Sequence, residues 1–134
     1  MEFAVVLPLL LVMTVGLVDF GRAAYEAIAV ENAAYAGASY GMRTPASAID
    51  ESGIETAALS DINENLADSE VDVDSERYCE CPDGKSVDCS TKCSGLNPLM
   101  YVRVRVEKKF KTFLSYPGIP HELELQREAS LRVR

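Results

Sequence analysis

The sequence predicts an α+β protein in which one long N-terminal α-helix precedes a small antiparallel β-sheet. Two observations indicate this fold class. Residues 2–43 are compatible with one unbroken helix, and residues from about 70 onward alternate apolar and charged side chains, as half-buried strands do. We expect two regions: residues 1–44 as a hydrophobic helix, and residues 45–134 as an α+β head with a four-cysteine loop at residues 79–93.

The N-terminal helix is predicted to begin with a strongly apolar segment. Phe3–Val18 is a run of sixteen residues without a charged side chain, and alanine-rich sequence follows it. Thr44 and Pro45 end the pattern, because a residue before proline is pushed out of helical geometry. Residues 2–43 then form a helix of roughly 60 Å at about 1.5 Å per residue. Pro8 is expected to kink or locally open it, since proline donates no backbone hydrogen bond.

The apolar run is expected to be buried by something other than the head of its own chain. A helix that is apolar on all sides must be buried in lipid or among other helices, and a protein of this size has no core to surround it. A membrane-spanning helix needs about 20 apolar residues, so the run of Phe3–Val18 is somewhat short. Glu2 in front of it has two interpretations. Its carboxylate pairs with the amino group of a neighbouring copy, or it lies in the headgroup layer.

Small residues recur every four positions in the second half of the helix, at Ala29, Ala33, Gly37 and Gly41. Such a row allows close approach of another backbone. Two arrangements remain open: the row packs beneath the head of its own chain, or it packs against copies of the same helix.

The head is predicted to contain a second helix and three strands. Ala46–Leu66 has apolar residues at helical spacing, with Gly53 as a possible break. Strands with one apolar and one charged face form an antiparallel sheet with one solvated side. The expected strands are residues 70–79, 100–110 and 122–133, with a loop at residues 116–120 between the last two.

The four cysteines lie close together, at Cys79, Cys81, Cys89 and Cys93, which suits an oxidising, extracytoplasmic compartment. A Cys79–Cys81 bridge would close a very tight ring. Of the remaining pairings we favour the nested one, Cys79–Cys93 with Cys81–Cys89, as suited to a hairpin. The alternative is a four-thiolate zinc site, but the spacings are not those of paired zinc knuckles.

Charge and composition exclude several classes of function. The net charge of −8 argues against nucleic acid as a partner. Residues 49–90 carry thirteen acidic and two basic side chains, whereas residues 91–134 carry nine basic and four acidic ones. We expect residues 49–90 either to form a solvated acidic face or to contact the basic residues 91–134, within the chain or between copies. His121 is a lone loop histidine, and the acidic stretch 68–74 lacks the glycine and closing glutamate of a calcium loop. We therefore predict no catalytic residues, no cofactor and no metal.

Three stretches of the long helix together resemble a known signature. They are residues 2–11 (EFAVVLPLLL), residues 16–23 (GLVDFGRA) and residues 30–34 (VENAA). Together they resemble the N-terminal signature of TadE-like pilins, in the tight-adherence branch of the type IV pilus superfamily. The residues that we expect to act in assembly are Glu2, Phe3, Pro8, Asp19, Arg22, Ala29, Ala33, Gly37 and Gly41.

The resemblance implies a structural subunit rather than an enzyme. It would be inserted in the inner membrane as a precursor, cut by a prepilin peptidase, and built by the pilus assembly machinery into an extracellular homopolymeric filament for adhesion. Glu2 would neutralise the N-terminus of an adjoining subunit. In the family this glutamate usually lies several residues beyond the cleavage point, so either a leader and a few residues precede this chain or processing differs. The alternative function is a membrane-anchored single-pass binding module or a minor pseudopilin.

Overall fold

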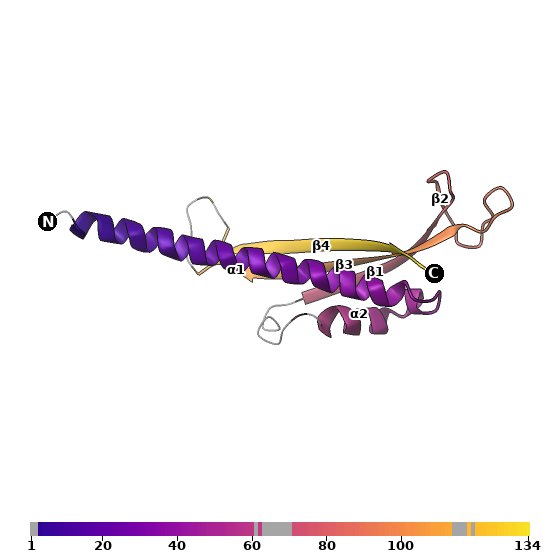
Figure 1. The fold of residues 1–134 in the computed structure, drawn as a ribbon, viewed down its shortest axis with the longest axis horizontal. Helices are drawn as coiled ribbons and strands as arrows, with labels where there is room; N and C mark the ends of the chain where they lie inside the picture. Colours follow the sequence, from indigo (N-terminus) through magenta and orange to yellow (C-terminus); the bar gives the residue numbers. More distant parts are fainter. Residues whose placement is uncertain (1–2, 61, 63–70, 114–117, 119) are drawn as a thin grey trace.

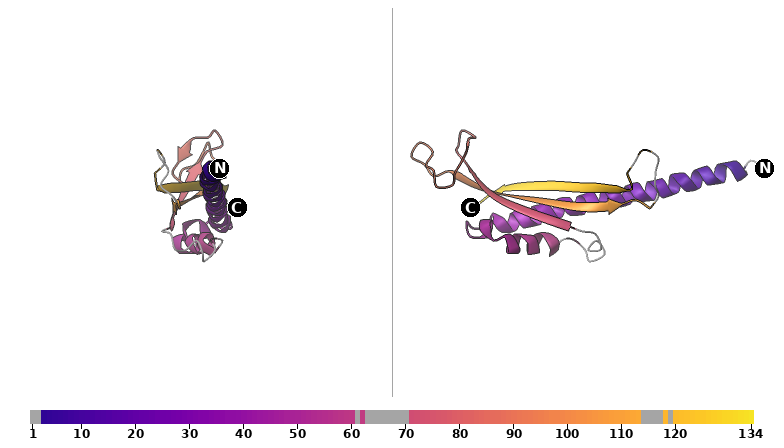
Figure 2. Two further views of the ribbon diagram at one scale, coloured as in Figure 1. Left: turned by 90° about the vertical axis from the view of Figure 1, so that its left-hand side faces the viewer. Right: turned by 180° about the vertical axis from the view of Figure 1, so that it is seen from behind.

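The structure, a computed structural model, describes residues 3–60, 62, 71–113, 118 and 120–134. Its fold is α+β, which confirms the predicted class. The elements are α1 (Phe3–Gly41), η1 (Ser47–Ile49, a 3-10 turn), α2 (Glu51–Ser60), β1 (Val71–Glu80), β2 (Ser86–Val87), β3 (Leu99–Lys111) and β4 (Glu122–Arg132). The strands form one antiparallel sheet in the order β2-β1-β3-β4. Both helices lie along one face of it, and the N-terminal half of α1 extends beyond it (Figure 1, Figure 2).

The long helix α1 has 39 residues and is therefore about 58 Å long at about 1.5 Å per residue. It ends at Gly41, two residues before the predicted end, and its predicted first residue lies outside the described residues. Pro8 lies inside α1, and the helix continues on both sides of it (Figure 1). A proline removes one backbone donor, and the rest of the helical ladder holds this position in the helix.

The second helix is shorter than predicted. It begins at Glu51 rather than at residue 46, because the Asp50 carboxylate caps its first turn. Asp50 Oδ1 accepts hydrogen bonds from the backbone N–H of Gly53 at 3.1 Å and from Ser52 Oγ at 2.9 Å. Gly53 is therefore part of the first turn and does not break the helix. The predicted end, Leu66, lies outside the described residues.

The core lies between the two helices and the sheet. Alternate residues of β3 face the helices, as the period of two predicts. The buried residues of this core are Val30, Ala33, Ala34 and Ala38 of α1, Ala48 of η1, Ile54 and Ala58 of α2, Ile62, Val102, Val104 and Val106 of β3, and Val133. The second half of α1 thus shares one core with the head, whereas the first half contributes nothing to it.

The strand boundaries agree with prediction to within one or two residues. β1 extends one residue further than expected, β3 extends by one at each end, and β4 ends one residue early. The expected first residue of β1, Glu70, lies outside the described residues, as does most of the loop at residues 116–120. β2 was not predicted. It has two residues, too few to show a period, and pairs with the end of β1.

The disulfide pairing differs from the favoured one. Cys79 pairs with Cys89 and Cys81 with Cys93, at Cα–Cα distances of 5.1 and 5.6 Å, so the bridges are not nested. The cause is the register of the unpredicted strand. Cys79 lies opposite Val87 in the β1–β2 pair, and Cys89 comes two residues after Val87, in the turn that follows β2. All four cysteines are bridged, which excludes the zinc alternative.

Candidate functional site

The candidate site is the first half of α1, which carries a series of exposed apolar side chains. These exposed residues are Val6, Leu7, Leu9, Leu10, Leu11, Val12, Met13, Leu17 and Val18. They point to all sides of the helix, and Figure 1 shows this segment projecting from the head. Among the described helices, α1 alone is long and apolar enough to cross a membrane. A surface of this kind is covered in its working state, by lipid or by other helices.

The predicted assembly residues at the start of this segment are described only in part. Glu2 lies outside the described residues, and of Phe3 only the backbone, as the first residue of α1, is described. Pro8 lies within the exposed apolar half. The proposed pairing of Glu2 with a neighbouring copy stays a prediction.

Asp19 and Arg22 join α1 to the end of β3. Asp19 is only 4% exposed, and its Oδ1 and Oδ2 accept hydrogen bonds from the backbone N–H of Phe113 at 3.2 and 3.0 Å. Arg22 Nη1 lies 3.4 Å from Asp19 Oδ1. The Arg22 guanidinium also lies over two rings, 4.0 Å from the centroid of Phe113 and 5.4 Å from that of Phe110. A carboxylate next to an apolar run is thus satisfied within its own chain.

A buried ion pair lies one helical turn after Arg22, at Glu26 of α1. Lys108 Nζ of β3 is 3.4 Å from Glu26 Oε2, and the two side chains are 2% and 12% exposed. This pair was not predicted from the sequence. Two signals were available: Lys108 continues the inward phase of Val102, Val104 and Val106, and Glu26 falls seven residues after Asp19, on the same helix face. An ion in a core position indicates a partner opposite it.

The small-residue row packs beneath the head of its own chain, the first of the two arrangements left open. Ala33 is fully buried. A Cβ on Gly37 would lie 3.1 Å from Val104 Cγ1, and a Cβ on Gly41 would lie 2.9 Å from Val102 Cγ2. Ala29 is half-buried. Contact between copies through this row stays a prediction, and these contacts do not support it.

The acidic middle and the basic C-terminal region meet within the chain, on the solvent side of the sheet. Arg103 Nη1 of β3 lies 3.3 Å from Glu76 Oε2 of β1, which joins the two regions. Arg105 Nη2 lies 3.0 Å from Glu128 Oε2 of β4, a pair within the C-terminal region. Hydrogen bonding to Glu128 raises the pKa of Arg105 above its ordinary value. These side chains are exposed, and pairs of this kind contribute about 0–1 kcal/mol each.

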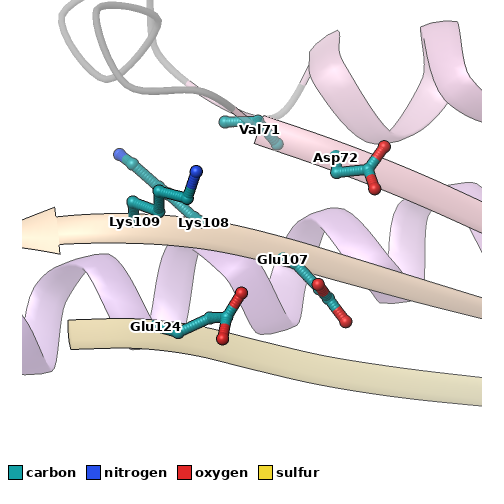
Figure 3. A pocket seen from close by; sticks show the side chains of 6 residues that line it. All are labelled: Val71, Asp72, Glu107, Lys108, Lys109 and Glu124. Atoms are coloured by element: carbon teal, nitrogen blue, oxygen red, sulfur yellow. The ribbon is translucent and has the colours of Figure 1, made fainter. Parts of the chain in front are cut away.

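A hollow of about 450 Å³ lies at the end of the sheet where β1 and β4 begin and β3 ends. Its described lining residues are Val71, Asp72, Glu107, Lys108, Lys109 and Glu124 (Figure 3). Charges of both signs line it. Asp72 and Glu107 are opposite each other in the register, as are Lys109 and Glu124. No serine, threonine, cysteine or histidine is among these described lining residues.

Two further predicted features are also located. His121 is exposed, and its Nδ1 lies 3.1 Å from Thr112 Oγ1, so it is a hydrogen-bonded surface residue. Within the ranges that the structure describes, no group of three or more His, Cys, Asp or Glu side chains is placed to hold a metal ion. Part of the acidic stretch 68–74 lies outside those ranges.

Comparison with known proteins addresses the N-terminal helix. Residues 1–39 match the family model described as TadE-like protein. No curated protein and no solved structure matches the chain. The matched segment contains the exposed apolar half of α1, the Asp19–Arg22 element and the start of the buried core. The resemblance predicted from the sequence is therefore confirmed over these residues: the N-terminal helix of this chain is similar to that of TadE-like proteins.

Proposed function

We propose that the chain is a structural subunit of a Tad-type pilus, which polymerises through the exposed half of α1 into an extracellular filament that serves adhesion. One observation carries this proposal: a continuous apolar half-helix, Val6–Val18, that its own head leaves uncovered. The TadE-like family is associated with Tad pili and is in general non-enzymatic, which supports a structural role.

The same apolar surface serves both stages of the proposed assembly. Full burial of one leucine, valine or phenylalanine side chain contributes roughly 1.5–3 kcal/mol relative to exposure in water. Before assembly, lipid of the inner membrane covers Val6–Val18, and in the filament the helices of neighbouring copies replace the lipid. The prepilin peptidase and the pilus assembly machinery are the partners that this route requires.

In this proposal residues 1–44 serve as membrane anchor and filament core, and residues 45–134 serve as the outer head. Glu2 neutralises the amino terminus of an adjoining copy, as the family resemblance implies. Replacing Glu2 by alanine is then expected to reduce the filament yield, whereas replacing the exposed Glu31 leaves it unchanged. An unchanged yield with Glu2→Ala would rule out this role of the carboxylate.

The test of polymerisation compares two matched substitutions in cells that produce the protein. Leu10→Asp places a charge in the exposed half-helix, and Leu96→Asp places one on an exposed leucine just after the cysteine loop. Protein sheared from the cell surface is then quantified. We expect Leu10→Asp to abolish the sheared fraction and Leu96→Asp to retain it. Equal amounts from both variants would contradict polymerisation through α1.

A second candidate function is a membrane-anchored single-pass binding module or a minor pseudopilin. It is favoured by the burial of Ala33, Gly37 and Gly41 against the chain's own head, because this row is then not free for contacts between copies. A protein that stays monomeric in detergent and is found only in the membrane fraction would support this candidate over the filament subunit.

A further inference from the structure

The end of β3 lies beside α1 at the point where the apolar run stops. The two hydrogen bonds from the Phe113 backbone N–H to Asp19 fix this level, since Asp19 is the first charged residue after Phe3–Val18. The Arg22 guanidinium, 4.0 Å from the centroid of the Phe113 ring, adds a second attachment. The position of Phe113 along α1 is therefore set by contacts within the chain.

Two phenylalanine rings are exposed at this level. Phe113 is 63% exposed and Phe20 is 73% exposed, although Phe110, three residues before Phe113, is buried. Phe20 directly continues the exposed surface of Leu17 and Val18. Phe113 lies against Arg22, two residues after Phe20, so an exposed ring of the head lies close to the end of the apolar half of the helix.

The length of the apolar run determines where this level falls in a membrane. Sixteen residues span about 24 Å at about 1.5 Å per residue, less than the roughly 30 Å of a hydrocarbon core. A short span draws its flanking residues into the interface. Tryptophan and tyrosine are enriched there, and phenylalanine lies on the apolar face of helices in this layer. An arginine keeps its aliphatic stem in the apolar layer while its guanidinium reaches water or phosphate. Phe20, Arg22 and Phe113 have this composition.

We propose that the end of β3 is a second membrane contact, in which Phe113 lies in the interfacial layer of the bilayer together with Phe20 and Arg22. The proposal rests on the membrane insertion of α1. Its partner is the lipid surface rather than a second copy of the chain, because Phe20 continues the surface that lipid covers and Phe113 is held against Arg22, two residues further along α1. Asp19 reaches this depth at low cost, since its carboxylate is already hydrogen-bonded to the Phe113 backbone N–H.

The chain contains no tryptophan, so a single introduced tryptophan reports on one position. Three variants of the full chain are reconstituted in vesicles of phosphatidylethanolamine and phosphatidylglycerol: Phe113→Trp, Leu96→Trp and Met13→Trp. Leu96 is the matched control, because it is 64% exposed and precedes the start of β3, whereas Phe113 follows the end of the same strand. Met13 reports on insertion of the exposed half-helix. Quenching by lipids brominated near the carbonyl or near the chain end is compared with quenching by aqueous iodide.

We expect Phe113→Trp to show a blue-shifted emission that is quenched by the carbonyl-end bromines. Met13→Trp should be quenched by the deep bromines, and Leu96→Trp by iodide alone. The inference is overturned, with insertion intact, if Phe113→Trp behaves like Leu96→Trp while Met13→Trp is quenched by lipid. It is also overturned if Phe113→Trp is blue-shifted but insensitive to both quenchers, since a second copy would then cover it. If Met13→Trp is not quenched by lipid, the membrane insertion itself fails.

Discussion

At the scale of single residues, the polar side chains on the inner face of α1 attach the helix to the end of β3 and the residues just after it. Asp19 accepts from a backbone N–H, and Glu26 pairs with Lys108. A buried ion pair adds little net stability, but removal of one partner leaves a charge without compensation. From Val30 onward, the interface between α1 and the sheet is apolar. The polar contacts of Asp19 and Glu26 therefore fix the position of β3 along α1 more than they add to the stability of the fold.

A hydrogen bond between α1 and the start of α2 makes a pH-dependent contribution to stability. Tyr40 Oη donates to Asp50 Oδ2 at 2.7 Å. This bond, followed by those from Gly53 and Ser52, lowers the pKa of Asp50 from its ordinary 3.8. It likewise raises the pKa of Tyr40 from 10.0.

The two shifts set the window in which this bond stabilises the fold. The lowered pKa of Asp50 gives a contribution present above pH 3.8 and lost as the pH falls through the lowered value. The raised pKa of Tyr40 gives one present below pH 10.0 and lost as the pH rises through the raised value. We expect Tyr40→Phe to lower the melting temperature in detergent between these limits, with a difference that shrinks outside them. A difference that does not vary with pH would contradict the assignment.

At the scale of elements, the glycines of α1 separate a packed half from a free half. A Cβ on Gly41 would approach two methyl groups of the buried Val102, at 2.9 and 3.1 Å, whereas a Cβ on Gly21 meets nothing within 4 Å. Overpacking costs about 1–3 kcal/mol, and replacement of a helical glycine by alanine gains about 0.5–1 kcal/mol. We therefore expect Gly41→Ala to lower the free energy of unfolding and Gly21→Ala to raise it. Thermal unfolding in detergent measures both, and a stabilising Gly41→Ala would show that α1 does not pack on β3 in this way.

The cysteine loop is an element whose connectivity can be read directly. Digestion of the unreduced protein after glutamate and lysine cuts at Glu80, Lys85 and Lys92, which places the four cysteines in four fragments. Mass spectrometry is expected to find the fragment that ends at Glu80 bridged to residues 86–92. A bridge from it to the fragment that begins at residue 93 would restore the nested pairing.

The elements that were predicted from the sequence are those long enough to repeat their period several times. Sixteen uncharged residues and an alanine-rich continuation predict α1, and alternation predicts β1, β3 and β4. It did not predict β2 or the start of α2, because a two-residue strand has no period and the start of α2 depends on one capping carboxylate, Asp50. The disulfide pairing depends on the register of β2, so it was not predictable either. In the candidate site, the apolar half-helix was predictable, whereas the contacts of Asp19 with Phe113 span 94 residues and have no local signal.

At the scale of the whole molecule, α1 divides into a half that belongs to the head and a half that belongs to its surroundings. The division falls near Asp19, whose carboxylate accepts hydrogen bonds from the backbone N–H of Phe113, two residues after β3. Figure 1 shows the N-terminal part of α1 extending beyond the sheet. The head stays attached to the second half of α1 through a common core. Lipid and neighbouring helices can therefore exchange on the first half without any change in the head, as the proposed passage from membrane to filament requires.

The most direct test of the proposed filament is electron microscopy of material sheared from cells that produce this protein, combined with mass spectrometry of the N-terminus of the sheared chain. We predict filaments built mainly of this chain, with the mature N-terminus given by the mass. Recovery of the chain only from the membrane fraction, with no filaments that contain it, would contradict a filament subunit and would leave the anchored module or the minor pseudopilin.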